Sequence, residues 1–319
     1  EFVSVLNGLA DRKNCDVFVT GSNAKFLSRD IATEFGGRGD EVHMYPLSFS
    51  EFMSVYDGNR YDGWNEYIIY GGIPLVVLAE TEEQKMAILD NLFRETYISD
   101  IVKRNKIRNV GELEALLDIL SSAIGALTNP NKLQKTFKSV NRSKITATTI
   151  TKYIEYLEDA FLIEEAVRYD IKGKSYIGTP LKYYFMDLGL RNARINYRQI
   201  EITHSMENVI YNELRMRGFS VDVGNLTIVE NGKDGKAVKK RLEVGFICNK
   251  GSKKYYIQSA YQLGTEEKLA QEIRPFLKIK DCFKKIVITS DTPKPCYTDE
   301  GILMMNVYDF LLNPELIDL

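Results

Sequence analysis

The pattern that most constrains this chain is an apolar run near its N-terminus that ends in small polar residues. Val17-Phe18-Val19 is typical of a short buried strand, and it is followed by Thr20, Ser22 and Asn23. A segment with helical spacing comes next, and Arg38 then stands in a glycine-rich turn. The pattern predicts an α/β fold with polar groups at the tip of a central strand.

Such polar groups could serve phosphate chemistry. A side chain at a strand tip can hold an attacking water or touch a γ-phosphate, and an arginine can neutralise the charge that develops on a transferred phosphoryl group. The alternative is a plain strand end with a turn, where Gly, Ser and Asn are common for backbone reasons. The sequence contains no Gly-x-x-x-x-Gly-Lys-Ser/Thr, so it lacks the loop that would cradle the phosphates.

Charge is distributed unevenly along the 319 residues, although the net charge is only −2. Residues 1–100 hold eight Lys/Arg and seventeen Asp/Glu, so the rest of the chain carries about +7. A polyanion partner would therefore bind the later part. Four cysteines without a C-x-x-C, and two histidines, indicate neither a zinc site nor a disulfide framework. Without a signal peptide or a long apolar run, we expect a cytoplasmic protein that does not enter a membrane.

Periodicity and capping signals predict the secondary structure. Ser48 and Glu51 form a capping-box pattern at the start of a helix, and Gly218 is placed to end another. Strands are expected at Asp16–Thr20, Val42–Tyr45, Leu162–Tyr169, Lys182–Met186, Ser220–Val223, Leu226–Val229, Leu242–Cys248, Tyr255–Ala260 and Lys285–Thr289. Helices are expected at Lys25–Phe35, Glu82–Lys106, Lys132–Val140, Thr146–Asp159, Met206–Arg217, Glu266–Leu277 and Val307–Leu312.

Several segments together resemble a prokaryotic family of AAA-type (P-loop) ATPases. They are Val17–Asn23, Gly36-Gly37-Arg38, Pro46–Phe52, Gly71-Gly72-Ile73-Pro74, Tyr97–Ile101, Tyr153–Ala160, Lys182–Leu190 and Glu207–Leu214. The resemblance implies a mixed, multidomain α/β protein. Residues 1–80 would be the C-terminal part of the ATPase core, and 81–190 a helical lid and α-helical winged-helix domain. Residues 191–319 would form a degenerate α/β domain with a restriction-endonuclease-like fold.

By this resemblance, Asn23 is the sensor residue and Arg38 the arginine finger or its equivalent. The intact protein would use ATP and Mg²⁺, and its phosphate loop and acidic strand would precede Glu1. We therefore expect this chain alone to need no cofactor, and neither to bind ATP tightly nor to hydrolyse it. Without neighbouring strands, residues 1–80 are expected to be poorly ordered, rearranged or completed by another chain.

The nuclease-like part departs from the pattern that metal-dependent cleavage requires. Gly245 stands where a metal-binding acid belongs, and Gln258 and Ala260 replace the Glu and Lys of a Glu-x-Lys. Glu207 and Glu213 remain on a helix, but they cannot hold a metal alone. The sequence therefore favours a binding or docking module with no metal, and a metal-dependent nuclease is the less favoured alternative.

The order of three helices and a hairpin between residues 113 and 186 is that of a winged helix. Residues 131–182 carry ten basic and six acidic side chains. Thr148 and Lys152 on the expected recognition helix, and Lys172 and Lys174 at the wing tip, are the candidates for contacting double-stranded DNA. The alternatives are a winged helix that only packs on the nucleotide domain, and a module that binds a protein partner or a second copy of the chain.

Overall fold

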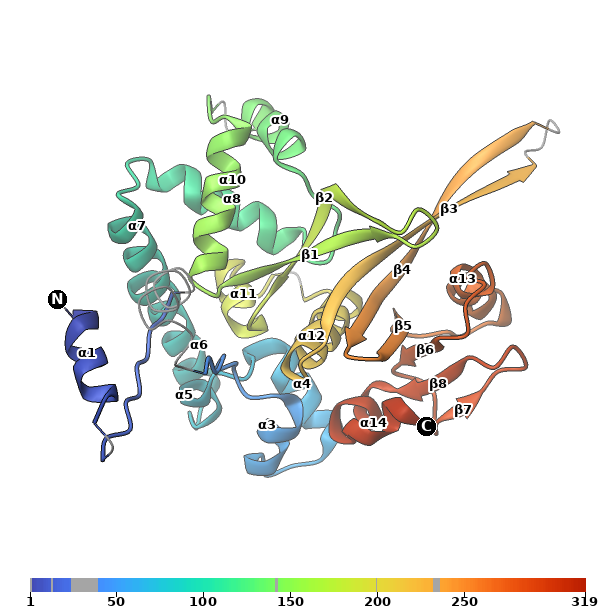
Figure 1. Cartoon of the computed structure of the whole chain (residues 1–319), viewed down its shortest axis with the longest axis horizontal. Coiled ribbons are helices and arrows are strands. Elements are labelled where there is room, and N and C mark those ends of the chain that lie inside the picture. Colours follow the sequence, from blue (N-terminus) through green and yellow to red (C-terminus); the bar gives the residue numbers. More distant parts are fainter. Residues whose placement is uncertain (1, 13, 24–39, 141–142, 199, 232–235) are drawn as a thin grey trace.

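The computed structural model describes residues 2–12, 14–23, 40–140, 143–198, 200–231 and 236–319. The fold is mixed α/β, with helices on both faces of one large sheet and a helical region beside it (Figure 1). Within the described ranges, no helix is both long and apolar enough to cross a membrane.

The sheet has eight strands in the order β2-β1-β3-β4-β5-β6-β8-β7. The pairs β1/β3, β5/β6 and β6/β8 are parallel, and the remaining pairs are antiparallel. Because β1 pairs with β3, the hairpin expected to be a wing belongs to the same sheet as the C-terminal strands. The strands are β1 Ile163–Asp170, β2 Ser175–Phe185, β3 Ser220–Asn231, β4 Ala237–Lys250, β5 Lys253–Ala260, β6 Lys284–Thr289, β7 Cys296–Tyr297 and β8 Leu303–Asn306.

The helices before the sheet form most of the helical region. They are α1 Phe2–Ala10, α3 Phe49–Val55, α4 Arg60–Tyr70, α5 Pro74–Val77, α6 Glu82–Asn91, the π-helical η2 Leu92–Ile98, α7 Ser99–Asn105, α8 Val110–Ser122, α9 Pro130–Val140 and α10 Ala147–Asp159. The later helices are α11 Leu188–Arg194, α12 Ile202–Met216, α13 Glu266–Leu277, α14 Val307–Leu312 and the 3₁₀ helix η3 Pro314–Asp318.

Local signals begin and end these helices as expected. The Ser48 side chain accepts from the Glu51 N–H while Glu51 accepts from the Ser48 N–H, so the predicted capping box is present at α3. Gly218 follows α12 with a φ of 78°, which a residue with a side chain rarely adopts.

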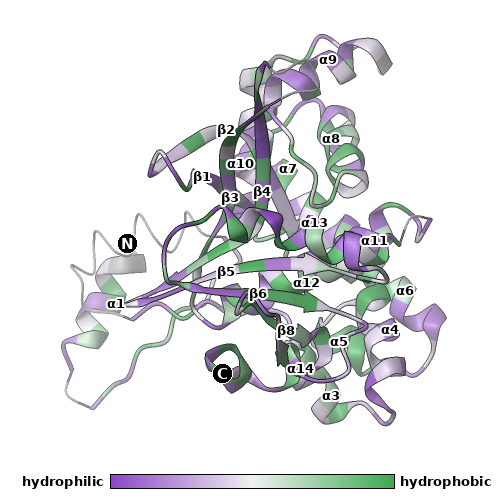
Figure 2. Ribbon diagram, turned by 90° about the vertical axis from the view of Figure 1, so that its right-hand side faces the viewer, coloured by the Kyte–Doolittle hydropathy of each residue, from purple (hydrophilic) through white to green (hydrophobic). Residues whose placement is uncertain are grey.

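Three apolar cores hold the layers together. The first lies between α12 and the sheet and takes in α3, α4 and α14. The second fills the helical region, and the third lies under α13 on the opposite face of the sheet. Figure 2 shows the apolar colouring of the central strand β6, whose Ile286, Val287 and Ile288 are fully buried. The sheet is therefore the middle layer of a three-layer arrangement.

The N-terminal part differs from the prediction in two ways. Residues 16–20 and 42–45 form no strand, and Phe18 and Met44 are 90% and 83% exposed, because no described strand pairs with them. In contrast, α3 and α4 are well packed, with Phe49, Phe52 and Trp64 at most 3% exposed. The expectation of disorder is therefore wrong for that stretch. The predicted helix Lys25–Phe35 lies outside the described residues.

Candidate functional site

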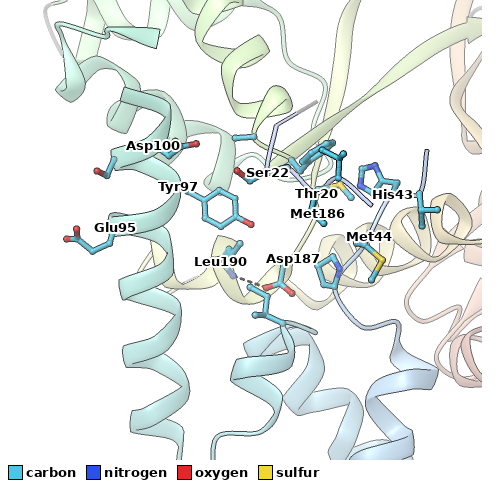
Figure 3. Close-up of a pocket in the computed structure, with 18 of the residues that line it drawn as sticks. Thr20, Ser22, His43, Met44, Glu95, Tyr97, Asp100, Met186, Asp187 and Leu190 are labelled. Atoms are coloured by element: carbon cyan, nitrogen blue, oxygen red, sulfur yellow. Dashed lines mark hydrogen bonds between the residues drawn. The ribbon is translucent and has the colours of Figure 1, made fainter. Parts of the chain in front are cut away.

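A cavity of about 760 Å³ lies where the N-terminal segment meets the helical region (Figure 3). Residues 19–22 and 41–44, with Pro46, line one side. The other sides come from η2 and α7 with Tyr97 and Asp100, from the end of α10, and from the start of α11 with Asp187 and Leu190. Segments that carried the family resemblance are thus brought together here from distant parts of the sequence.

Asp187 is the buried carboxylate of this cavity. Its side chain caps α11 by accepting from the Leu190 N–H at 3.1 Å, and it accepts from the Gly72 N–H at 2.8 Å. Burial raises the pKa of Asp187 to about 6, although these N–H groups favour the ionised form. One carboxylate therefore joins the α4–α5 connection to the start of α11.

Glycines permit the close approach of the α4–α5 connection to the start of α11. At Gly71, which has a φ of 76°, a Cβ would overlap the carboxylate of Asp187, and at Gly189 it would overlap the carbonyl oxygen of Tyr70. At Gly72 a Cβ would overlap the Leu47 carbonyl, and the Leu47 N–H also donates to the Gly72 carbonyl at 2.8 Å. Gly71-Gly72 and Gly189 therefore allow the backbones of these segments to pack closely.

Two asparagines of α12 form hydrogen bonds with the backbone directly before Asp187. Asn208 donates to and accepts from the backbone of Phe185 at 2.7 and 2.8 Å. Asn212 donates to the carbonyls of Phe185 and Met186 at 3.0 and 3.1 Å. These bonds satisfy backbone groups at the end of β2, directly before Asp187, on a strand that pairs with β1 and lies at the edge of the described sheet.

The cavity lining does not fit a triphosphate. Glu41, Glu95, Asp100 and Asp187 face one cationic side chain, Lys103, and burial lowers the pKa of His43, which disfavours its charged form. Carboxylates repel phosphate oxygens unless cations intervene. The described residues alone therefore give no phosphate cradle.

The predicted nucleotide-sensing residues are placed only in part. Thr20 and Ser22 line the cavity, and Figure 3 shows Ser22 near the ring of Tyr97. Asn23 is 6% exposed and is absent from the lining, whereas Arg38 lies outside the described residues. Their assignments as sensor and arginine finger stay predictions.

The four predicted DNA-binding residues lie on two separate elements. Thr148 and Lys152 are exposed on the first two turns of α10, beside Pro130 at the start of α9. Lys172 and Lys174 are exposed in the turn between β1 and β2. Figure 1 shows this turn at the far end of the hairpin from α10.

The predicted nuclease residues divide between the two faces of the sheet. Gln258 accepts from the Gly245 N–H at 2.9 Å and donates to Glu272 of α13 at 2.8 Å. Glu207 and Glu213 lie on α12, which covers the other face, and Glu213 pairs with Arg217 at 2.7 Å. Within the described ranges, no three His, Cys, Asp or Glu side chains are placed to hold a metal ion.

Sequence reasoning missed a buried charge cluster on the α12 face. Lys182 of β2 lies 2.9 Å from Glu207 and 2.7 Å from Glu243 of β4, and Tyr184 donates to Glu207 at 2.6 Å. Burial alone would lower the pKa of Lys182, but the two carboxylates raise it above its ordinary value. Strand alternation puts Lys182 and Tyr184 on one face, whereas the pairing with Glu243 is non-local and has no local signal.

A second carboxylate, half-buried Glu158 near the end of α10, has no described hydrogen-bond partner at its buried Oε1. Burial, with the negative charges of Glu165 and Asp159, raises the pKa of Glu158 to about 8. A carboxylate near a helix C-terminus is also disfavoured by the helix dipole. The side chain is therefore protonated at neutral pH.

This arrangement predicts a defined pH dependence of stability. Between pH 4.5 and 8, folded Glu158 keeps a proton that the unfolded chain releases, so its ionisation lowers stability as the pH rises. Glu158→Gln should match the native chain near pH 4 and be more stable by about 2 kcal/mol above pH 8. Urea unfolding across that range measures this, with exposed Glu155→Gln as control. An unchanged pH profile in Glu158→Gln would contradict the assignment.

Sequence comparison adds relatives of unknown activity. The AAA domain family matches residues 1–53, and a domain of unknown function (DUF8612) matches residues 61–201. An uncharacterized protein of Haemophilus influenzae is 36% identical over 313 residues, which cover 97% of this chain and 74% of that protein. The uncharacterized protein MJ1544 of Methanocaldococcus jannaschii is 31% identical over 312 residues, and the chain spans only 65% of its length.

Among solved structures, protein VC1899 from Vibrio cholerae matches with a TM-score of 0.24 and 10% identity, over 89% of this chain and 64% of that one. This likeness is too weak to support an argument about fold or function.

Proposed function

Because the chain belongs to the same family as the uncharacterized Haemophilus influenzae protein, and an AAA domain matches its first 53 residues, we propose that it is the C-terminal portion of an AAA-type ATPase. In the intact protein, ATP and Mg²⁺ drive a rearrangement of the nucleotide domain. The rearrangement changes the positions of the helical and sheet regions of this portion, and these regions bind a partner. The chain alone has no ATPase activity, and nuclease activity is not part of the proposal.

The observation that carries this proposal is the cavity between the N-terminal segment and the helical region. One wall is the AAA-matched segment, including Thr20 and Ser22, and the opposite walls are η2, α7 and the Asp187 cap. His43 stacks on Tyr45 and meets Phe161 edge-on at 4.7 Å, which attaches this segment to the end of α10. A movement of the segment on nucleotide binding would therefore press directly on the helical region.

The order of elements supports the division into 1–80, 81–190 and 191–319. Helices α8, α9 and α10 followed by the β1–β2 hairpin have the order of a winged helix. The later run α12-β3-β4-β5-α13-β6 combines an antiparallel three-stranded unit with a parallel crossover, which is compatible with a nuclease-like fold without its acids. Since β1 pairs with β3, a displacement of one unit must strain the other.

ATP should affect the longer protein and leave this chain unchanged. We expect the purified chain to release no phosphate from ATP and to show no melting shift with ATP and Mg²⁺. The longer Haemophilus influenzae relative should hydrolyse ATP and should show a melting shift with ATP and Mg²⁺. In that relative, amide exchange in the segment aligned with Leu92–Asn105 should be slower with ATP than with ADP. ATP hydrolysis by this chain, or a hydrolysing relative with unchanged exchange there, would refute the proposal.

Nucleic-acid binding is a second candidate function, with a nucleic acid as the partner that this portion of the protein binds. Lys132, Lys135, Lys138 and Lys144 are exposed on or just after α9, and Lys152 is exposed on α10. Within the described residues, none of these five lysines forms a salt bridge. Unpaired cations on two adjacent helices favour a phosphate backbone as partner, and binding should then weaken steeply as salt rises.

A further inference from the structure

We propose that a basic ribbon built from two hairpins, away from the helices of the winged helix, is the surface that binds duplex nucleic acid. The ribbon consists of the outer part of the β3–β4 hairpin and the β1–β2 turn. Its cations are Lys172, Lys174, Lys236, Lys239, Lys240 and Arg241. This inference rests on the second candidate function, nucleic-acid binding, and assigns it to a surface that joins the expected wing tip to the β3–β4 hairpin, which the winged-helix pattern does not indicate.

The β3–β4 hairpin extends beyond the sheet. The pairing of β1 with β3 ends at Asn225, and the pairing of β5 with β4 begins only at Phe246. From the Leu226–Leu242 pair outward, the two strands pair only with each other among the described strands. Figure 1 shows this part projecting from the body as a two-stranded ribbon. A ribbon of this kind can enter the major groove of a duplex.

The base of the ribbon is fixed to the body. Ile228 is 5% exposed and belongs to the core under α13. On the same face, Glu230 forms ion pairs with Arg274 of α13 and with Lys240, the latter at 3.3 Å. These contacts hold the ribbon in one direction, so that binding through its other face requires little ordering of the backbone.

That other face carries unpaired cations. Lys239 pairs across the hairpin with Val229, and Arg241 with Thr227, whereas Lys240 pairs with Ile228. Because side chains alternate, Lys239 and Arg241 share the face opposite the α13 core. Both are exposed, and within the described residues neither forms a salt bridge.

The β1–β2 turn adds cations at the foot of the ribbon. The Ile171 N–H donates to the Asn225 carbonyl at 3.0 Å, which places the turn beside β3 where the ribbon begins. Lys172 and Lys174 are exposed in this turn, which Asp170 shapes by accepting from the Lys172 and Gly173 N–H groups at 3.0 Å each. The strand order then puts these lysines two strands from Arg241, roughly 10 Å away.

Charge complementarity selects the partner. Among the described residues of the ribbon, six cations stand against two acids, Asp170 and Glu230, in a chain whose net charge is −2. A row of exposed, unpaired Lys and Arg is the usual electrostatic contact for phosphates. The exposed Val229, 62% accessible beside Lys239, is small enough to lie in a groove. We therefore assign the ribbon to a duplex, contacted mainly at its phosphates.

The test is fluorescence anisotropy of a labelled DNA duplex titrated with the full chain at several salt concentrations. Lys239→Ala/Arg241→Ala should weaken binding about tenfold at low salt and reduce the slope of log affinity against log salt by about two. Lys172→Ala/Lys174→Ala should have a similar but smaller effect. Lys278→Ala/Lys280→Ala, at exposed lysines at the end of α13 that form no salt bridge within the described residues, is the matched control and should bind like the native chain. Lys135→Ala/Lys138→Ala on α9 tests the competing helical surface and should weaken binding less than the ribbon variants. All these side chains are exposed, and melting curves verify that each variant folds.

Each contrary outcome is distinct. If only the α9 variant loses binding, the ribbon assignment is overturned while nucleic-acid binding stands. If the native chain binds no duplex even at low salt, both are overturned. If the ribbon variants change the oligomeric state in light scattering but leave duplex binding intact, the ribbon binds a second copy of the chain, and the assignment is again overturned.

Discussion

Gly189→Ala should destabilise the chain by about 3 kcal/mol, the upper end of the usual effect of overpacking. The added Cβ would overlap the carbonyl oxygen of Tyr70, and this contact is with rigid backbone. Relief would require α11 to move away from α4. Movement of α11 would in turn stretch the hydrogen bonds from the Gly72 N–H to Asp187 and from the Asn192 side chain to the Ile68 carbonyl, at 2.8 Å each.

Gly111→Ala provides the matched control, because Gly111 is also helical but exposed, and its Cβ would meet nothing closer than 4.0 Å. That substitution should stabilise the chain by about 0.5–1 kcal/mol through helix propensity. Urea unfolding midpoints of the two variants measure the difference. Equal stability of Gly189→Ala and the native chain would mean that α11 is not held against the end of α4.

Lys182→Met should be similarly costly, by about 3 kcal/mol at neutral pH. The lysine side chain is 6% exposed and the partner Glu207 is 14% exposed, so removing the cation leaves a nearly buried carboxylate uncompensated. Glu243 is 38% exposed and can turn to solvent, so its share of the loss is small. Lys172→Met is the control, since Lys172 is exposed and within the described residues forms no ion pair. The stability of this variant should equal that of the native chain.

The pH dependence checks the same cluster. Because the folded pKa of Lys182 lies above its ordinary value, its stabilising contribution is complete at neutral pH and is lost only as the pH rises through that folded pKa. The double variant Lys182→Met/Glu207→Gln should recover part of the loss, because the carboxylate no longer needs a counter-charge. No recovery would show that packing, and not charge, sets the cost.

Local sequence signals predicted individual elements well. The helices α13 and α14 have the predicted bounds, and the capping box of α3 is present. These features depend on residues within one or two turns, so the sequence contains their causes. The interruption predicted between Ser220–Val223 and Leu226–Val229 is wrong, because β3 continues through Gly224 with a register shift against β4. The short strands β7 and β8 and helix α11 were not predicted.

The candidate site could be predicted only in outline. Thr20, Ser22, Tyr97 and Asp187 all lay in segments that the sequence singled out, but their convergence on one cavity follows from contacts over more than a hundred residues. The predicted strand at 16–20 fails for a related reason, since a strand requires a partner and apolar spacing supplies none.

The sequence by itself determined most of the helices and the longer strands of the sheet, the caps of α3 and α12, and that the cationic charge lies in the later part, because these depend on near neighbours and composition. Only the tertiary structure decided that β1 joins β3, that Asp187 connects α11 to the α4–α5 connection, and that Lys182 is buried between two glutamates. Such pairings are selected by the free energy of packing and by the desolvation of charges, which exist only once distant segments have met.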